Sequence, residues 1–302
     1  MASYQELKKL SEEEYKKYWK DWHQKRERKI SSPYDWLSLK SIDWLSDGKK
    51  LRVEDFPGEW EQNGDTVTYF PEKGKTVFNR GKEVTSPKKM LVDAIADVNV
   101  EDFEYAGVKA QLIKRIGSDK KFAVRQRDPQ SKFRKDFKGL PHFEPDQDWI
   151  LPAHYVSLND WRNLKTKAAV GGLSHNETQI GKLFFEYKNQ EYQFVVFQAH
   201  NDDSGWTKLD PRTGKIKYLN NRQNTSSKGT IYFRDQTTGK ETYGGGRRIR
   251  INISDPQKLD FIDFNTAVNL PCAFSYFCTC PFAPVENTLP FAVPVGEKTP
   301  KK

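Results

Sequence analysis

Lys182-Leu-Phe-Phe-Glu-Tyr187, a turn at Asn189-Gln190, and Tyr192-Gln-Phe-Val-Val-Phe197 form the stretch that decides the fold. Both arms are rich in aromatic and β-branched residues, which are favoured in strands. Two such runs separated by a short polar turn predict a β-hairpin. The second arm ends in the unbroken apolar run Phe194-Val-Val-Phe197, so we expect it to be a central strand of a sheet.

The same strand-and-turn pattern recurs on both sides of this hairpin. Upstream, Asp65–Phe70, Lys75–Phe78 and Val108–Ile113 alternate with turn signals and predict a β-meander. The fold class predicted is mainly β, with two β-rich lobes of meander or barrel-like antiparallel sheets. We expect an N-terminal segment at 1–32, a first lobe at 33–145 and a second lobe at 146–302.

The N-terminal segment is predicted to be an amphipathic helix packed as a strap. Ser11 and Glu14 form a capping box, so the helix begins here. Tyr15, Tyr18, Trp19 and Trp22 follow at i, i+3, i+4 and i+7, which is typical of a helical face docked on the protein. The range 87–98 is the other helix candidate.

Composition limits the class of protein. The chain has 302 residues, with 50 Lys and Arg against 41 Asp and Glu and a net charge of +9. No apolar run approaches the roughly 18 residues that a membrane helix needs, and the N-terminus lacks the apolar core of a secretion signal. We therefore expect a soluble, cytoplasmic protein that does not enter a membrane, and three reduced cysteines.

The densest basic stretch runs from Lys114 to Lys138 and holds ten Lys and Arg residues. One interpretation is a surface that follows nucleic-acid phosphates or binds an acidic partner. The favoured interpretation is alternating strand residues that face water, because no nucleic-acid motif accompanies the charge. Nucleic acid is thus an unlikely partner.

A glycine run beside arginines is the best candidate for ligand contact. Thr242-Tyr243 leads into Gly244-Gly245-Gly246 and then Arg247-Arg248. Successive amides of a glycine run can form an anion-binding nest, and an adjacent arginine offers a two-pronged donor for carboxylate or phosphate. A glycine bulge that redirects a strand is equally compatible with the local sequence.

Cys272, Cys278 and Cys280 invite the hypothesis of a zinc site. Their spacing lacks a paired C-x2-C unit and no histidine lies nearby, so buried thiols are favoured and no metal ligand is assigned.

Acids and amides also occur among apolar neighbours near the C-terminus, where burial would perturb a carboxyl pKa. For Asp263 and Asn265 a structural role is slightly favoured, while Glu286 and Asn287 are left open between loop structure and ligand contact.

Several of these residues lie in one long pattern: Phe233-Arg-Asp-Gln-Thr-Thr-Gly-Lys-Glu-Thr-Tyr243, Gly246-Arg247, Asp263-Phe-Asn265, Pro271-Cys-Ala273, Cys280-Pro281, Pro284, Glu286-Asn287, Leu289-Pro290 and Gly296-Glu297. This pattern resembles the C-terminal signature of a largely bacterial family, the domain of unknown function number sixteen eighty-four. The resemblance implies a shared β-rich fold and a common site, but no activity. Cys278 is not part of that signature, so the resemblance favours Cys272 and Cys280 for any shared thiol function.

The leading functional hypothesis is an enzyme or binding protein for a small anionic molecule. Arg247 and the amides of Gly244, Gly245 and Gly246 would hold the anion, Thr242 and Tyr243 would donate hydrogen bonds, and Arg125 with Asp128 would close the site from the first lobe. The full set predicted comprises the catalytic candidates Asp235, Tyr243 and Glu286 and, for ligand contact, Arg125, Asp128, Thr242, Gly244, Gly245, Gly246, Arg247, Asp263, Asn265 and Asn287.

Two alternatives stay open: a flavin-binding β-barrel, and a non-catalytic module that binds nucleic acid or an acidic partner through residues 114–138. The sequence identifies no cofactor and no oligomeric state.

Overall fold

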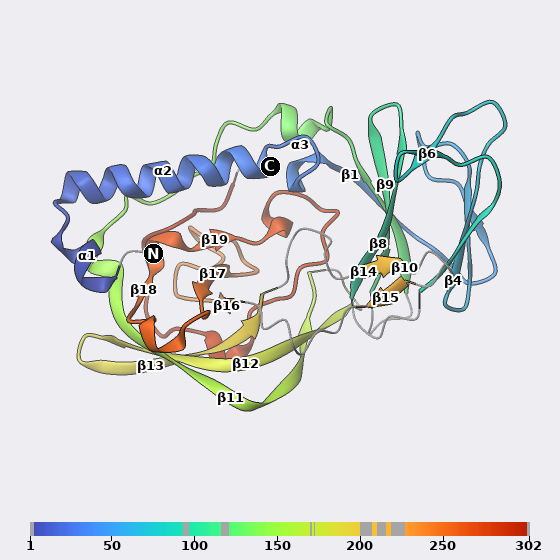
Figure 1. Ribbon diagram of the computed structural model, residues 1–302. Coiled ribbons are helices and arrows are strands. Elements are labelled where there is room, and N and C mark those ends of the chain that lie inside the picture. The colour runs from blue at the N-terminus through green and yellow to red at the C-terminus, as the bar shows by residue number, and fades with distance from the viewer. Residues whose placement is uncertain are drawn as a thin grey trace.

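The computed structural model describes residues 3–92, 97–115, 121–169, 171, 173–199, 207–209, 216–218 and 227–300. The protein is mainly β, with antiparallel sheets and an N-terminal helical segment, as predicted. The strand orders of the described residues do not close into a barrel. Figure 1 shows one group of sheets at each end of the molecule, and the N-terminal helix α2 lying along the group that carries the C-terminal half of the chain. The division of the chain at residues 32 and 145 stays a prediction.

A six-stranded and a four-stranded sheet share one core in the first half of the chain. The six-stranded order is β1-β10-β9-β8-β5-β6 and the four-stranded order is β2-β3-β4-β7. Trp60, Tyr69 and Phe103 pack edge to face or tilted at the centre, where all three are fully buried. The strands are β1 (Leu39–Trp44), β2 (Lys50–Leu51), β3 (Glu59–Asn63), β4 (Thr66–Phe70), β5 (Phe78–Asn79), β6 (Lys82–Glu83), β7 (Lys88–Leu91), β8 (Val98–Tyr105), β9 (Val108–Lys114) and β10 (Phe122–Arg127).

The second half of the chain forms a seven-stranded sheet of order β18-β11-β12-β13-β16-β17-β19. Its core includes Phe185, Phe194, Phe233 and Phe264. A separate two-stranded sheet pairs β14 with β15. The strands are β11 (Ile150–Lys167), β12 (Ser174–Tyr187), β13 (Gln190–Gln198), β14 (Thr207–Leu209), β15 (Ile216–Tyr218), β16 (Lys228–Phe233), β17 (Arg247–Asn252), β18 (Phe261–Asp263) and β19 (Val268–Asn269).

The predicted hairpin is β12–β13, and its turn lies one residue earlier than expected. Tyr187 pairs with Gln190, which leaves Lys188 and Asn189 as the two turn residues. Both have positive φ, 51° and 60°. That geometry matches the right-handed twist of the flanking strands, which explains why a two-residue turn is used. The second arm is central in the sheet, as predicted, because β13 pairs with both β12 and β16.

The helices are α1 (Tyr4–Lys9), α2 (Glu12–Ile30) and the short α3 (Lys132–Lys135), with single 3-10 turns at 36–38, 147–149, 256–258, 264–266, 271–273 and 285–287. The capping box at Ser11 and Glu14 is present, as predicted. The helix expected within 87–98 is wrong where the structure describes it, since Lys88–Leu91 is strand β7. Pairing with β4 outweighs local propensity there, and residues 93–96 lie outside the described part.

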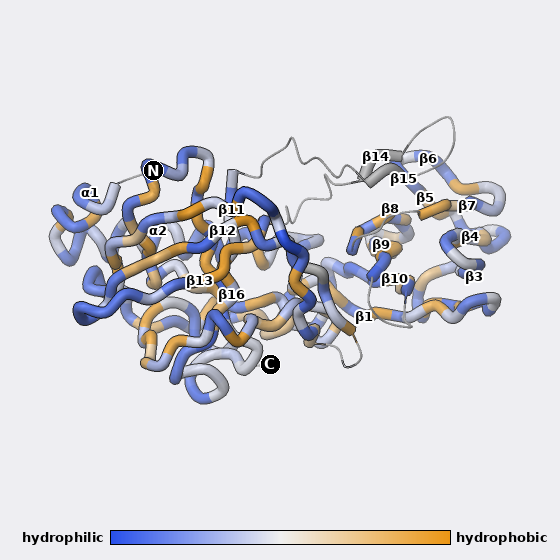
Figure 2. The backbone as a smooth tube through the Cα atoms, turned by 90° about the horizontal axis from the view of Figure 1, so that it is seen from below, coloured by the Kyte–Doolittle hydropathy of each residue, from blue (hydrophilic) through white to orange (hydrophobic). Residues whose placement is uncertain are grey.

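The hydropathy of the backbone follows this arrangement. Figure 2, seen from below, shows apolar segments in the strands of both sheet groups and polar segments at their margins. In the first group, β10 contributes Phe122 and Val124 to the shared core of the two sheets. Alternate residues of that strand, including Arg125 and Arg127, therefore lie on the other face of the sheet. Strand periodicity thus decides which basic residues turn away from this core.

Candidate functional site

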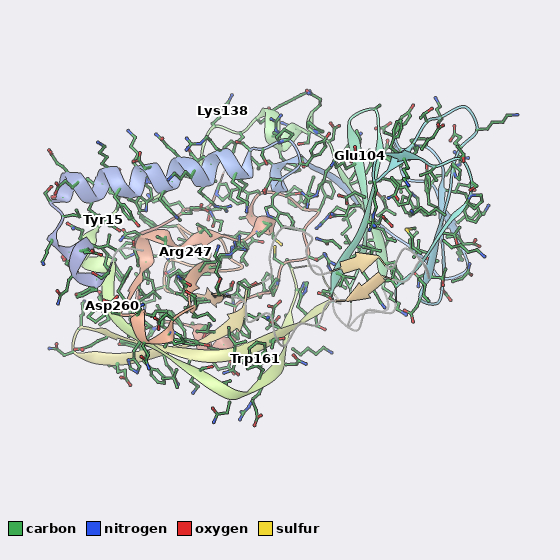
Figure 3. All side chains as sticks on the ribbon, in the orientation of Figure 1. Tyr15, Glu104, Lys138, Trp161, Arg247 and Asp260 are labelled. Carbon is green, nitrogen blue, oxygen red and sulfur yellow. The ribbon has the colours of Figure 1, made fainter. Side chains whose placement is uncertain are left out.

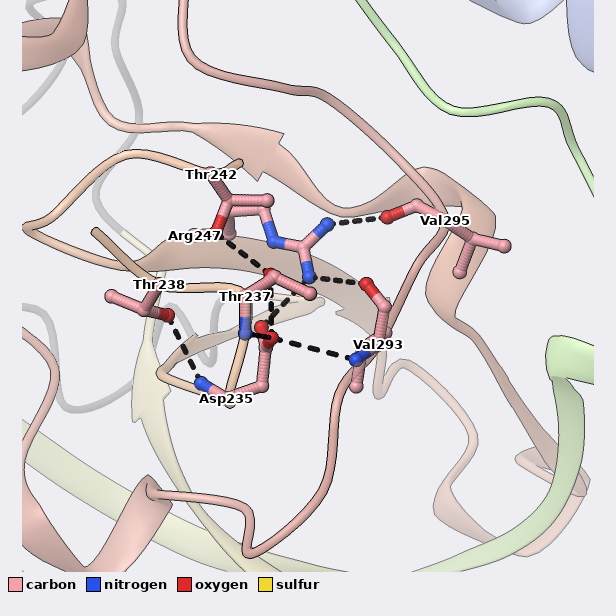
Figure 4. Close-up of polar contacts among 7 residues, drawn as sticks. All are labelled: Asp235, Thr237, Thr238, Thr242, Arg247, Val293 and Val295. Carbon is pink, nitrogen blue, oxygen red and sulfur yellow. Dashed lines mark hydrogen bonds and ion pairs between the residues drawn. The ribbon is translucent and has the colours of Figure 1, made fainter. Parts of the chain in front are cut away.

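Arg247, the centre of the predicted anion site, lies inside the protein and is already bound by protein acceptors. Its Nη2 atom donates to the Asp235 Oδ2 atom at 2.8 Å and to the Val293 carbonyl at 2.8 Å, and its Nη1 atom donates to the Val295 carbonyl. Figure 4 shows these contacts, and Figure 3 places Arg247 among the strands. Its side chain is 0% exposed. Burial lowers the pKa of Arg247, while the charge of Asp235 opposes that shift.

Asp235 is equally enclosed. Its Oδ1 atom accepts from the amide and the hydroxyl of Thr237 at 2.7 and 2.5 Å, and that hydroxyl lies 2.9 Å from the hydroxyl of Thr242. These bonds hold the 235–242 turn against β17. A ligand role for Arg247, Asp235 and Thr242 stays a prediction, and a ligand would have to displace these partners.

The three glycines form a compact turn, and each of them has different surroundings. Gly246 has φ +90°, and an added Cβ atom would lie 2.5 Å from the Phe233 carbonyl oxygen. The Gly246 amide donates to the Tyr243 carbonyl at 2.9 Å. Gly245 faces the Tyr243 ring, whereas Gly244 has open space. The backbone at position 246 therefore lies so close to the neighbouring strand that only glycine fits there.

Asp263 and Asn265 anchor helix α2. The Tyr15 hydroxyl donates to Asp263 Oδ2 at 3.0 Å, and the Trp19 Nε1 atom donates to the Asn265 carbonyl at 2.8 Å. The Asn265 amide group bonds the backbone of Asp146 with both of its polar atoms, each at 2.8 Å. Burial raises the pKa of Asp263, and its hydrogen-bond donors counteract only part of that shift.

The remaining signature polar residues also have specific partners. The Asn287 side chain bonds the backbone of Val195 and Tyr232, at 2.7 to 3.0 Å, and so ties β13 to β16. Glu297 is 1% exposed and accepts from the Arg26 Nε atom at 3.2 Å and from the Asn269 amide at 2.7 Å. Glu286, in contrast, is exposed in the 285–287 turn.

The basic stretch from Lys114 to Lys138 does not present its strand cations to water, so that expectation is wrong. Lys114, Arg115, Arg125 and Arg127 are all buried, at 9% exposure or less. Lys114 lies on the core face of the sheet, where its Nζ atom donates to the Val92 carbonyl at 2.8 Å. On the opposite face other parts of the chain supply acceptors: Thr279 accepts from the Arg115 Nε atom at 3.0 Å, and the carbonyls of Tyr34 and Asp35 accept from Arg127, each at 3.0 Å. Lys120 lies outside the described residues.

The two residues expected to close the site from the first lobe, Arg125 and Asp128, have different surroundings. The Arg125 Cζ atom lies 5.3 Å from the centre of the Trp36 ring. Trp36 and Tyr243 both pack against the buried cluster that contains the three cysteines. Asp128 instead caps a turn, accepting from the Gln130 amide at 2.7 Å.

Burial first, and then the neighbouring thiols, raise the pKa of Tyr243.

The cysteines themselves form a compact buried group. The Cys272 amide donates to the Cys280 Sγ atom at 3.2 Å and the Cys280 amide donates to the Cys272 Sγ atom at 3.1 Å. Cys278 belongs to the same buried cluster. All three are free and buried, as expected. Within the described ranges, no three His, Cys, Asp or Glu side chains are placed to hold one metal ion.

A groove with a volume of about 980 Å³ lies between helix α2 and the strands β17 and β18. Helix α2 contributes Tyr18, Trp22, Lys25 and Lys29, which follow at i, i+4, i+7 and i+11. The opposite wall contributes Arg248 and Arg250 from β17, Lys258 from the 256–258 turn and Phe261 from β18, and Trp36 also lines the groove. The groove is thus lined by cations and aromatic rings.

Sequence reasoning missed the groove because it treated the four aromatic residues of α2 as one face. The structure divides them: Tyr15 and Trp19 are buried against the sheet, whereas Tyr18 is 49% exposed and lines the groove with Trp22. The signal that would have found it is the second stripe, Tyr18, Trp22, Lys25 and Lys29, which lies beside the buried stripe at the same helical spacing.

The C-terminal half of the chain, which carries most of these residues, is similar to a known protein family. A model of the family described as protein of unknown function (DUF1684) matches residues 135–298, more than half of the chain. The protein belongs to the DUF1684 family. The DUF1684 match contains the Asp235–Arg247 pair, the three cysteines and the β17–β18 wall of the groove, while α2 and Arg125 lie outside it.

The DUF1684 chain is also similar to a solved structure described as the solution NMR structure of the uncharacterized protein from gene locus rrnAC0354 of Haloarcula marismortui. The identity is 26%, the match covers 55% of this chain and 79% of that chain, and the TM-score is 0.39. No curated protein matches the chain. Among the described helices, none has an apolar stretch long enough to cross a bilayer.

Proposed function

We propose that this DUF1684 protein binds a small anionic molecule with a planar apolar part in the groove between α2 and β17–β18. The groove, at about 980 Å³, is as large as the ligand pockets of proteins, which span roughly 300–1,000 Å³. The observation that carries the proposal is the combination of basic and aromatic side chains on its two walls.

The charge of the groove favours an anion. Six basic and four acidic side chains line it. The pair of Asp255 with Lys258 at 3.0 Å removes one charge of each sign, and Arg26 is paired with Glu297 at 3.2 Å. Asp263 is held by Tyr15 at 3.0 Å. Lys25 and Lys29 form no ion pair within the described part of the chain, and they face β17, which carries Arg248 and Arg250. Converging positive charges on two walls attract and orient an anionic group.

The aromatic lining favours a planar apolar part beside that charge. Tyr18 is 49% exposed although it lies on a helix whose adjacent stripe is fully packed. Trp22 lies one turn further along the same wall. Rings of this kind bury large areas against a flat ligand and add a stacking contribution of about 0.5–1.5 kcal/mol.

The proposal moves the anion site away from Arg247. It needs neither Asp235 nor Glu286 as acid or base, because the first is enclosed in an ion pair and the second is exposed outside the groove. A binding role is therefore preferred to a catalytic one. The flavin alternative loses support because it required a barrel, and the described strand orders are open.

The test uses two fluorescent probes of similar shape, the anion 8-anilinonaphthalene-1-sulfonate and the uncharged N-phenyl-1-naphthylamine. The variant Lys25→Gln/Lys29→Gln is compared with Lys17→Gln/Lys20→Gln, which removes two exposed lysines of α2 outside the groove. We expect about tenfold weaker binding of the anionic probe by the groove variant, equivalent to about 1.4 kcal/mol. The control variant and the uncharged probe should show little change.

Trp22→Ala should weaken the binding of both probes, because it removes the stacking surface that they share. Near-ultraviolet circular dichroism checks that each variant is folded. If the two lysine variants bind the anionic probe equally, the lysines serve only the C-terminal end of the helix dipole, and the proposal is wrong.

A further inference from the structure

The groove between α2 and β17–β18 has two chemically different ends, and this polarity restricts the ligand further. Tyr18 and Lys29 lie at i and i+11 of α2, so the stripe that lines the groove is about 16 Å long at 1.5 Å per residue. Aromatic residues occupy the first half of this stripe and lysines the second half. A ligand that uses both halves must therefore be elongated.

The end of the groove beside the first turns of α2 is apolar and aromatic. Leu7 of α1 and Phe261 of β18 pack in one cluster with Tyr15, and both also line the groove. Figure 1 shows α1 and β18 beside this end of α2. Tyr18 follows Tyr15 by one helical turn and presents its ring to the same end. Two rings and an aliphatic side chain thus offer surface for an apolar group.

The charges at this aromatic end disfavour an anion. Asp260 and Asp263 both line the groove here, and Asp260 accepts from the Tyr4 amide at 3.3 Å. The cation that follows in the 256–258 turn, Lys258, is paired with Asp255 at 3.0 Å. A carboxylate of the ligand placed here would meet like charges.

The opposite end of the groove lies beside the last turns of α2 and is cationic. Arg26 donates to Glu297 at 3.2 Å, and Glu297 accepts from the Asn269 amide at 2.7 Å, so these turns are tied to β19. Lys25 and Lys29 are exposed on the same turns and belong to none of the ion pairs among the described side chains. The two lysines can therefore receive an anionic group.

The charge available at the cationic end suits one carboxylate better than a doubly charged phosphate. Arg26 is already paired with Glu297, so Lys25 and Lys29 supply the positive charge of α2. Asp35, in the loop after α2, lines the groove as well, and the negative end of the helix dipole lies nearby. Both would repel a second negative charge.

On the basis of the proposed function, we propose that the ligand is a rod-shaped aromatic carboxylate that binds in one direction. Its carboxylate lies beside Lys25 and Lys29. Its rings lie against Trp22 and extend to Tyr18. About 10 Å of helix separates Tyr18 from Lys25, a span that two aromatic rings in line can bridge and a single ring cannot.

Isothermal titration calorimetry of the folded protein tests the shape and the charge of the ligand. Biphenyl-4-carboxylate is compared with its bent isomer biphenyl-2-carboxylate, with benzoate, and with the uncharged biphenyl-4-carboxamide. We expect biphenyl-4-carboxylate to bind about tenfold more tightly than each of the other three. Equal affinity of the two isomers would overturn the rod shape, and equal affinity of the carboxamide would overturn the contact with the lysines.

Variants test the direction of binding. Tyr18→Ala should weaken biphenyl-4-carboxylate about fivefold and leave benzoate unchanged, because benzoate at the lysines does not reach Tyr18. Lys25→Gln/Lys29→Gln should weaken both carboxylates by a similar factor. Tyr276→Ala, which removes a tyrosine that is 67% exposed and outside the groove, is the matched control and should change neither affinity. Equal weakening of both carboxylates by Tyr18→Ala would show that the assigned direction is wrong.

The naphthalene sulfonate probe separates a failure of this inference from a failure of the proposed function. If Lys25→Gln/Lys29→Gln weakens that probe while the two biphenyl isomers bind the wild type equally, the groove binds anions but the rod-shaped class is wrong. If the lysine variant leaves that probe unchanged, the proposed function and this inference are both wrong.

Discussion

The hydroxyl of Tyr15 donates a hydrogen bond of 3.0 Å to the carboxylate of Asp263, across 248 positions of sequence. The bond joins the first turn of α2 to the end of β18, and both residues are buried. Trp19 adds a second bond from the next turn of the helix, to the carbonyl of Asn265. The N-terminal helix is thereby held by the segment that begins with Asp263. This attachment also defines one wall of the groove.

Tyr15→Phe should destabilise the protein by about 1–3 kcal/mol, because it removes a donor from a buried carboxylate. Guanidinium unfolding at neutral pH measures the loss. Tyr18→Phe is the matched control, since Tyr18 is 49% exposed and has no hydrogen bond within the described residues. Equal stability of the two variants would show that the Tyr15 bond contributes nothing.

Asp263→Asn should change how stability depends on pH. Burial raises the pKa of Asp263 in the folded protein, so the folded state binds its proton more readily than the unfolded state does. The stability contributed by this group is fully present below the ordinary carboxyl pKa of about 3.9. It is lost as the pH rises through the folded-state pKa.

The free energy of unfolding of the wild type minus that of the variant should therefore fall as the pH rises above about 4, by at most about 1.36 kcal/mol per pH unit. Urea unfolding of both proteins in a series of buffers measures this difference. A difference that stays constant or rises with pH contradicts the prediction.

Arg247→Met should destabilise the protein by about 3–5 kcal/mol, because it leaves the Asp235 carboxylate buried without its partner. Asp235→Asn should have a similar effect. The double variant should lose less than the sum of the two, because neither charge then remains alone, and the thermodynamic cycle measures the coupling. If Arg247→Met keeps wild-type stability, the Asp235–Arg247 pair does not stabilise the fold, and a ligand-binding role of Arg247 is favoured.

Gly246→Ala should destabilise by at least about 1–2 kcal/mol, since its φ of +90° is unfavourable for a residue with a side chain. The added methyl group would also lie 2.5 Å from the Phe233 carbonyl oxygen. Gly244→Ala is the control, because its added Cβ atom would have no neighbour closer than 3.9 Å. Its stability should stay within about 0.5 kcal/mol of the wild type. Thermal unfolding of both variants shows whether the loss of stability is specific to position 246 or follows any replacement of glycine by alanine in this turn.

Local patterns predicted a good share of the fold. The capping box at Ser11 and Glu14 located the start of α2, and the alternation around 182–197 located the central hairpin. These features depend on residues a few positions apart, so the sequence holds the relevant interactions. The 88–91 strand was missed because its partner β4 lies about 20 residues upstream.

The candidate site was less accessible to such reasoning. A glycine run next to Arg247 looked like an anion-binding loop, but the Asp235 carboxylate and two carbonyls from residues 293 and 295 occupy the guanidinium. Arg125 and Arg127 looked like surface cations because a strand with one covered face normally turns alternate residues to water. Residues 34–36 cover these two arginines instead, since the Trp36 ring packs on both and the carbonyls of Tyr34 and Asp35 accept from Arg127.

By itself, the sequence determined the mainly β class, the start of the capped helix and the membership of the DUF1684 family, because each depends on short-range spacing or on a long shared signature. Only the tertiary structure decided which charged groups are paired or hydrogen-bonded within the protein and which line the groove that a ligand can enter. The physical reason is that the energy of a buried charge depends on its neighbours in space, and Tyr15 with Asp263, or Arg115 with Thr279, become neighbours only when distant strands and helices pack together.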